Sequence, residues 1–153
     1  MDYTIDYLAH HPMVVDTLAE WHHAQWSYLD RDVTQEQRAA ALRRRRSDDI
    51  PLTVVALAGE TILGSASLIR HDMDTRMALS PWLASVYVAS DYRRHGIGSA
   101  LVRRIEHEAR TLGYRTLYLF TPDMQRFYET LGWTRLESTV YRGYTQVVMT
   151  QHL

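Results

Sequence analysis

The stretch YVASDYRRHGIGSALVRRIEHEA, from Tyr87 to Ala109, joins an apolar, β-rich run to a helix-forming run through Gly96 and Gly98. Glycine in a helix interior costs about 1 kcal/mol relative to alanine, so two glycines at a helix start need a reason. The first N–H groups of a helix have no partner within it, and the helix dipole places partial positive charge there. Because glycine has no Cβ, an anion can approach those N–H groups closely. The stretch therefore predicts a strand–turn–helix unit that binds phosphate.

Three phosphate-binding patterns compete for this stretch. The nucleotide P-loop needs a Gly-Lys pair, and the chain contains none, so that pattern is excluded. The dinucleotide fingerprint G-x-G-x-x-G/A needs a small residue at position 101, which is Leu101. The pattern that remains is R-x-x-G-x-G, running from Arg93 to Gly98.

The rest of the chain alternates between strand-like and helix-like patterns. We expect strands at 3–8, in the hairpin 52–69 around Gly59-Glu60, at 81–90, at 115–121 and in the hairpin 134–153 around Arg142-Gly143. We expect helices at 12–27, from Thr34 onward and ending before Pro51, at 98–112 and within 122–132. Thr34 and Gln37 have the spacing of a capping box. The order β-α-α-β-β-β-α-β-α-β-β predicts an α/β fold in which helices flank a mixed central sheet.

Apolar residues mark the buried faces of two of these helices. The helix 98–112 and its first turn carry one apolar stripe, formed by Ile97, Leu101, Ile105, Ala109 and Leu112. In the last helix Met124, Phe127 and Leu131 share a face. Tyr128 lies off that face in this pattern, so we expect it to be outside the core.

Length and charge exclude several classes of protein. The 153 residues suffice for one sizeable core, and we expect a single domain over residues 1–153. The formal net charge of −1 gives no general attraction to nucleic acid or to anionic membranes. The beginning of the chain lacks the basic and apolar regions of a secretory signal, and the apolar run 62–69 is too short to span a bilayer. We expect a cytoplasmic monomer or homodimer that binds neither nucleic acid nor membrane.

Cysteine and histidine usage bears on metal and covalent chemistry. The absence of cysteine excludes disulfides, thiolate metal sites and a cysteine nucleophile. The pairs His10-His11 and His22-His23 lack a metal-ligand spacing, because neighbours on a helix point about 100° apart. We therefore expect no metal. The run Arg43–Arg46 precedes Asp48-Asp49 at a predicted helix end, and we interpret it as a solvated helix terminus.

Two motifs together resemble the GNAT superfamily of N-acetyltransferases. VYVASDYRRHGIGSALV (86–102) looks like the family's acetyl-CoA pyrophosphate loop. LYLFTPDMQRFYETLGW (117–133) is similar to its following strand and its helix ending in Phe-Tyr-x-x-Leu-Gly-aromatic. The element order matches over nearly the whole chain. One departure is Thr121-Pro122-Asp123, where many members carry an asparagine just after the strand.

The resemblance implies acetyl-CoA as cosubstrate and assigns residues to it. Backbone N–H groups from Arg94 to Ser99 would bind the pyrophosphate, and Arg93 or Arg94 would add charge. The family's central strand is bulged, so the backbones of Val86, Tyr87 and Val88 would bind the acetyl carbonyl and the pantetheine. The implied cofactor-binding set is Val86, Tyr87, Val88, Arg93, Arg94, His95, Gly96, Ile97, Gly98 and Ser99. Tyr128 would protonate the departing thiolate.

The lack of a cysteine and of a G-x-S-x-G elbow favours direct attack by the amine in a ternary complex over an acyl-enzyme. The sequence does not identify the general base. We name Glu20 on the first helix, with His22, His23 and Asp72 as alternatives.

The acceptor site of this fold is usually built from the loop between the first two helices, here 24–34, and the loop before the central strand, here 70–82. We expect substrate contacts from Trp26, Tyr28, Asp72 and Asp74. Further candidates are Trp82 as an apolar wall, Asp30 and Asp32 for a cationic amine, and Arg31 and Arg76 for a carboxylate. We expect an N-acetyltransferase with a small-molecule amine or amino-acid-like acceptor. The alternatives are a protein N-terminal or lysine acetyltransferase and, in another class, a non-catalytic acyl-CoA-binding module.

Overall fold

The fold follows the predicted order of elements. A computed structural model describes all of residues 1–153. Its seven-stranded sheet has the order β1-β2-β3-β4-β5-β7-β6, and only the β4–β5 pairing is parallel. The strands are β1 (Thr4–Tyr7), β2 (Leu52–Ala58), β3 (Thr61–Ile69), β4 (Trp82–Val88), β5 (Thr116–Thr121), β6 (Thr134–Tyr141) and β7 (Tyr144–His152). The helices are α1 (Val15–Trp26), α2 (Gln35–Arg43), α3 (Ile97–Thr111) and α4 (Gln125–Thr130). None of these helices combines the length and the apolar character needed to cross a bilayer.

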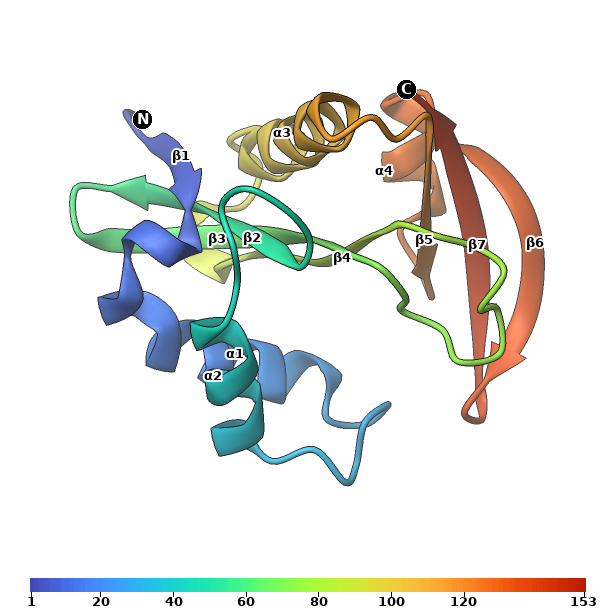
Figure 1. Ribbon diagram of the computed structural model, residues 1–153, viewed down its shortest axis with the longest axis horizontal. Coiled ribbons are helices and arrows are strands. Elements are labelled where there is room, and N and C mark those ends of the chain that lie inside the picture. Colours follow the sequence, from blue (N-terminus) through green and yellow to red (C-terminus); the bar gives the residue numbers. More distant parts are fainter.

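The helices cover both faces of the sheet. α3 and α4 lie on one face, and α1 and α2 lie on the other (Figure 1). β2 is buried along most of its length because alternate residues enter two cores. Val54 and Ala56 pack in the core beneath α3, whereas Val55 and Leu57 pack in the core beneath α1 and α2. This explains why β2 reads as a continuous apolar run rather than an alternating one.

Local sequence signals fix the helix starts. The capping box of α2 is confirmed: the Gln37 N–H donates to Thr34 Oγ1 at 3.1 Å, and the Thr34 N–H donates to Gln37 Oε1 at 2.8 Å. α3 begins one residue earlier than expected, at Ile97, because Gly96 is its N-cap with a left-handed φ of 77°. That conformation is inexpensive only for glycine, which accounts for the first of the two glycines.

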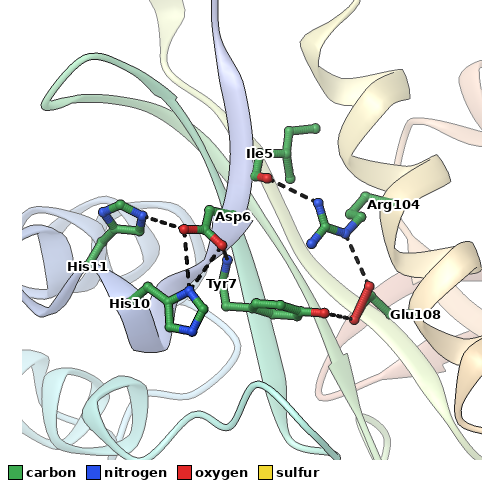
Figure 2. Close-up of polar contacts among 7 residues, drawn as sticks. All are labelled: Ile5, Asp6, Tyr7, His10, His11, Arg104 and Glu108. Atoms are coloured by element: carbon green, nitrogen blue, oxygen red, sulfur yellow. Dashed lines mark hydrogen bonds and ion pairs between the residues drawn. The ribbon is translucent and has the colours of Figure 1, made fainter.

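A polar network ties the edge strand β1 to α3 (Figure 2). The Tyr7 hydroxyl donates to Glu108 Oε1 at 2.5 Å, and Arg104 Nε donates to Glu108 Oε2 at 3.1 Å. Arg104 Nη1 also donates to the backbone carbonyl of Ile5 at 3.0 Å. The hydrogen bond to Glu108 raises the pKa of Tyr7, with burial adding to it. The network holds α3, and with it the glycine loop, against the sheet.

The central strand β4 carries the bulge that the family resemblance implies. Ser65 pairs with Tyr87 and Ser67 with Ala84, so β4 has one residue more than β3 over this interval. Ser85 within the bulge has a left-handed φ of 54°. β4 pairs with β5 at one position alone, Trp82 with Tyr118. Beyond it the two strands diverge, so the β5-facing edge of β4 lacks a strand partner (Figure 1).

Gly64 permits this bulge, which gives a first prediction. A Cβ at Gly64 would lie 2.4 Å from the Tyr87 carbonyl oxygen and 3.2 Å from Val88 Cα, both backbone atoms. We expect Gly64→Ala to lower the free energy of unfolding by about 1–3 kcal/mol, because the bulged strand must move. Urea denaturation measures this. Gly98→Ala is the comparison, since Gly98 also lacks a positive φ and its added Cβ would meet other side chains only at an ordinary 3.7 Å. An equal loss in both variants would contradict the steric argument.

Candidate active site

The loop before α3 presents a run of backbone N–H groups without partners. The first backbone bond of this helix is from the Ala100 N–H to the Gly96 carbonyl at 3.1 Å. The amides from Arg93 to Ser99 donate to no backbone acceptor. No side chain caps the helix, and its first turn contains no acidic residue. An uncapped helix start of this kind has the donors and the partial positive charge that a diphosphate requires.

Gly98 lies where the two halves of the sheet diverge, and we call the space left by its missing side chain the slot. A Cβ at Gly98 would lie 3.7 Å from Val88 Cγ2 on β4 and 3.7 Å from Phe127 Cζ on α4. β4 and α4 lie on opposite sides of the divergence between β4 and β5. The second glycine therefore leaves more space between β4 and α4 than a residue with a side chain would. Arg93 borders the same place, because its Nε donates to the Val88 carbonyl at 2.9 Å.

A buried histidine supports the bulge from the opposite face. His22 Nε2 lies 2.9 Å from Ser65 Oγ, and that hydroxyl donates to the Ser85 carbonyl at 3.0 Å. Burial, together with the charges of Arg38 and Arg45, lowers the pKa of His22 to about 3. His22 is thus neutral at physiological pH and, since the Ser65 proton is used, donates its Nε2–H to Ser65 Oγ. It orients the bulge and is too weakly basic to suit the role of general base.

Tyr128 is buried, which corrects the expected face of α4. It is the residue of α4 with a buried side chain, 8% exposed, and its ring packs 6.1 Å from that of Trp133. Met124 instead is 46% exposed, because it lies at the N-cap outside the helical turn. Burial raises the pKa of the Tyr128 hydroxyl well above its usual value, and no hydrogen bond contributes. The group stays protonated throughout the physiological range.

Aromatic side chains form a wall beside the bulge on the α1 face. The Tyr87 ring lies 5.4 Å from that of Trp21 and 6.2 Å from that of Trp26, between ring centroids. Trp21 and Tyr87 also line a cavity of about 620 Å³ together with Met13. The structure thus places Trp26, an expected substrate residue, next to Tyr87, an expected cofactor residue.

A second group of expected residues converges on the β6–β7 turn. Arg142 pairs with Asp30, and its Nη2 donates to Asp74 Oδ2 at 2.9 Å. The Tyr28 ring packs 4.8 Å from that of Tyr144. Tyr28, Asp30 and Arg142 line a cavity of about 430 Å³. The sequence indicates only that Arg142 lies in a turn. That Arg142 lines this cavity follows from tertiary contacts, which no sequence pattern marks.

Asp72 is a half-buried carboxyl without an ion pair. Burial raises the pKa of Asp72 to about 7, and Asp30 contributes to the increase while Arg142 and Arg45 oppose it. A carboxyl that titrates near neutral pH at the edge of the acceptor side has the proton affinity that a general base needs. Among the four candidates for the base, it is the one whose surroundings tune it toward that role.

The raised pKa of Asp72 predicts a pH-dependent stability effect. Because the folded pKa lies above the usual 3.8, ionisation of Asp72 lowers the free energy of unfolding. This loss of stability is absent at low pH and becomes complete as the pH rises through 7. Since part of the side chain remains exposed, we expect Asp72→Asn to stabilise the protein by about 1–2 kcal/mol at pH 8 and by less at pH 5. Thermal melts at both values measure the difference. Asp32→Asn, an exposed carboxyl of the same loop system, should show none; equal gains in both variants would contradict the assignment.

Several expected residues lie elsewhere. Glu20 is on the exposed face of α1, and no contact connects it with the bulge. Trp82 is fully buried, with its Nε1 donating to the Leu79 carbonyl, so it is a core residue and not a wall of the site. Arg76 is bound to Glu137 at 2.6 Å and is therefore not available for a substrate carboxylate.

The arginine run is only partly a solvated helix end. Arg43 and Arg46 are exposed and pair with Asp16 and Asp48. Arg45 instead turns inward, where its Nε donates to Thr53 Oγ1 at 3.0 Å. The interpretation of the whole run as solvated is wrong for this residue, because α2 ends at Arg43 and the chain then turns toward the sheet.

Several known proteins share this architecture. The chain superposes on an aminoglycoside 6'-N-acetyltransferase complexed with coenzyme A with a TM-score of 0.77 at 17% identity, covering 97% of this chain and 96% of that one. It superposes on the ribosomal-protein-alanine N-acetyltransferase of Brucella melitensis with a TM-score of 0.77 at 20% identity, covering 98% and 99%. Over 137 residues it is 29% identical to N-alpha-acetyltransferase 80 of Mus musculus. That match covers 77% of this chain and 44% of the mouse protein, so the chain spans less than half of that relative.

The bulged, diverging sheet and the glycine loop are therefore those of the N-acetyltransferase fold. Residues 15–133 match the Acetyltransferase (GNAT) family. The chain belongs to this family.

Proposed function

We propose that the protein transfers an acetyl group from acetyl-CoA to a primary amine. The observation that carries the proposal is the run of unpaired amides from Arg93 to Ser99, placed at the mouth of the slot that leads to the β4 bulge. These donors fit a diphosphate. The narrow pantetheine arm would pass through the slot beside Gly98, and the unpartnered edge of β4 would supply amides for it. When bound, acetyl-CoA supplies an activated thioester.

Residues of the chain would supply the other three functions: stabilisation of the acetyl oxygen, a base and an acid. The β4 backbone at Val86, Tyr87 and Val88 would stabilise charge that develops on the acetyl oxygen. The amine attacks the carbonyl carbon, so a C–N bond forms while the C–S bond breaks. In place of Glu20, we assign Asp72 as the base that takes the surplus amine proton, directly or through water. Tyr128 would give its proton to the departing thiolate.

Two acceptor classes fit the open side of the bulge. A small amine or amino-acid-like molecule fits the cavities lined by Tyr87 and by Tyr28. A peptide N-terminus is the second class, and the similarity to N-alpha-acetyltransferase 80 supports it. A non-catalytic acyl-CoA-binding module would need neither Asp72 with its raised pKa nor a protonated Tyr128 beside the slot.

Ligand-dependent stability tests the cofactor assignment. We expect CoA or acetyl-CoA at a hundredfold excess over Kd to stabilise the protein by about 2.7 kcal/mol. For a chain of this size, this corresponds to an increase in Tm of roughly 5–10 °C. NAD and ATP should produce much smaller shifts. No shift with either CoA form would refute the proposal.

Release of free thiol from acetyl-CoA in the presence of amines tests transfer itself. We expect thiol release to depend on the amine. CoA binding without amine-dependent release across small amines, amino acids and peptides would favour the non-catalytic module.

A further inference from the structure

We infer that the amine acceptor carries a carboxylate close to its amino group, and that Arg38 and Arg45 bind this carboxylate. The inference rests on the proposed function and specifies the acceptor for the same site. It depends on two inward-facing guanidinium groups that the chain leaves incompletely paired.

Arg38 extends from α2 into the interior, and its side chain is 14% exposed. Its Nε donates to His23 Nδ1 at 3.3 Å, whereas its Nη2 is buried and has no hydrogen-bond partner. The nearest carboxylate oxygen, on Asp30, lies 3.8 Å from Nη2, and Asp30 is already paired with Arg142. A buried guanidinium donor without a partner is costly, because the lost hydration is not replaced.

Arg45 is the second inward-facing cation. Its Nε donates to Thr53 Oγ1, which lies 2.7 Å from Ser67 Oγ, and it forms no ion pair. Burial lowers its pKa, followed by the charge of the neighbouring Arg44. The outward-facing Arg43 is paired with Asp16 at 2.5 Å. The chain thus supplies a carboxylate to an exposed arginine of this segment and only hydroxyl groups to the inward one.

The position of the two arginines connects them to the chemistry. Arg38 contacts His23, the residue that follows His22 on α1. Arg45 contacts Thr53, which bonds Ser67, two residues along β3 from Ser65, the partner of His22. His22 in turn contacts Ser65, whose hydroxyl binds the Ser85 carbonyl in the bulge. A carboxylate held by the arginines would therefore lie on the same side of the sheet as the bulge, separated from it by this short polar chain.

The balance of charge leaves room for one anion. Asp30 and Asp74 are engaged by Arg142. Asp72 is the remaining carboxyl near Arg45, and with a pKa near 7 it is only partly ionised at neutral pH. Neither guanidinium has a carboxylate of its own: Arg45 forms no ion pair, and the Asp30 carboxylate 3.8 Å from Arg38 Nη2 is shared with Arg142. A planar carboxylate suits the two-pronged donor geometry of arginine.

Matched acceptors test the inference. Glycine and glycinamide differ in the carboxylate next to the amine, and peptides beginning Asp-Asp or Asn-Asn differ in side-chain carboxylates. We expect at least about tenfold higher kcat/KM for the carboxylate member of one pair, or about 1.4 kcal/mol. The pair that responds identifies the source of the carboxylate. Equal rates within both pairs would overturn the inference while leaving the proposed function intact.

Binding without turnover gives an independent measurement. In the presence of CoA, the product-like N-acetylglycine or an N-acetylated Asp-Asp peptide should raise Tm, and the corresponding amide should not. Failure of CoA itself to raise Tm would indicate instead that the proposed function is wrong. A CoA response with no difference between acid and amide forms would overturn the carboxylate subsite.

Variants connect the effect to the two arginines. We expect Arg38→Gln and Arg45→Gln each to abolish the preference for the carboxylate mainly through KM, with the CoA-dependent Tm shift unchanged. Arg45→Lys retains the charge if Arg45→Gln does not fold, and it should keep only part of the preference. Arg43→Gln is the matched control, since that residue faces solvent, and it should keep the full preference. An undiminished preference in Arg38→Gln and in Arg45→Gln, or in Arg45→Lys where Arg45→Gln does not fold, would overturn the assignment.

Discussion

Tyr128→Phe is expected to lower kcat by about 10²–10⁴, the usual effect of removing a positioned acid, while the acetyl-CoA dissociation constant stays within a few-fold of the original. The hydroxyl makes no hydrogen bond within the protein, and burial keeps it protonated. A free thiol has a pKa of about 8.5, so a tyrosine with a raised pKa is a weak acid for it in water. The transfer is favourable only if the same buried surroundings also destabilise the thiolate, which the proposed path of the cofactor between β4 and α4 would ensure.

Stability separates this role from packing. Tyr128 belongs to the core beneath α3, so a larger truncation would unfold part of the structure. Phenylalanine retains the ring and removes a hydroxyl that has no partner, and we therefore expect an unchanged or slightly higher Tm. Tyr114→Phe, a change at a partly buried tyrosine packed against the same core, controls for nonspecific effects. Unchanged kcat in Tyr128→Phe would assign the proton to solvent or to another group.

Features encoded by neighbouring residues could be predicted from the sequence. The capping box at Thr34, the turn at Gly59-Glu60 and the start of α3 at the glycines each depend on a few consecutive residues, and each is confirmed. The bulge at Ser85 could not be read from its residues, because Ser-Val-Tyr-Val is an ordinary strand sequence. It followed from the family resemblance alone.

Features that depend on long-range packing could not be predicted. α4 is only six residues long, and Met124 lies at its N-cap instead of within the helix. The buried face of α4 therefore differs from the face predicted from the three apolar residues. Arg45 differs from Arg43 only in where the chain turns after α2. The contact between Arg142 and Asp74 joins residues 68 positions apart, and no local signal marks it. For these reasons the strand, turn and helix of the glycine loop could be predicted from the sequence, whereas the contacts on the proposed acceptor side could not.

Gly98→Val gives the other large expected effect, on cofactor binding. The first atom of the new side chain would sit 3.7 Å from Val88 Cγ2 and from Phe127 Cζ, which is ordinary contact. The fold can therefore accept this Cβ atom, and valine has a higher helix propensity than glycine. The two further methyl groups would fill the slot and displace a ligand from the amides of the loop. Losing two charge-assisted hydrogen bonds costs about 3 kcal/mol, which corresponds to an affinity for CoA roughly 100-fold lower.

Calorimetric titration of CoA measures this affinity, with thermal melts to establish that the variant is folded. Gly98→Ala adds one carbon atom and should lose less affinity than Gly98→Val, because contact at 3.7 Å leaves room for that atom. Thr111→Val, at the exposed opposite end of α3, introduces the same side chain far from the slot and should bind CoA normally. A folded Gly98→Val protein with unchanged affinity would mean that the cofactor does not cross between β4 and α4. The unpaired amides before α3 would then need another ligand.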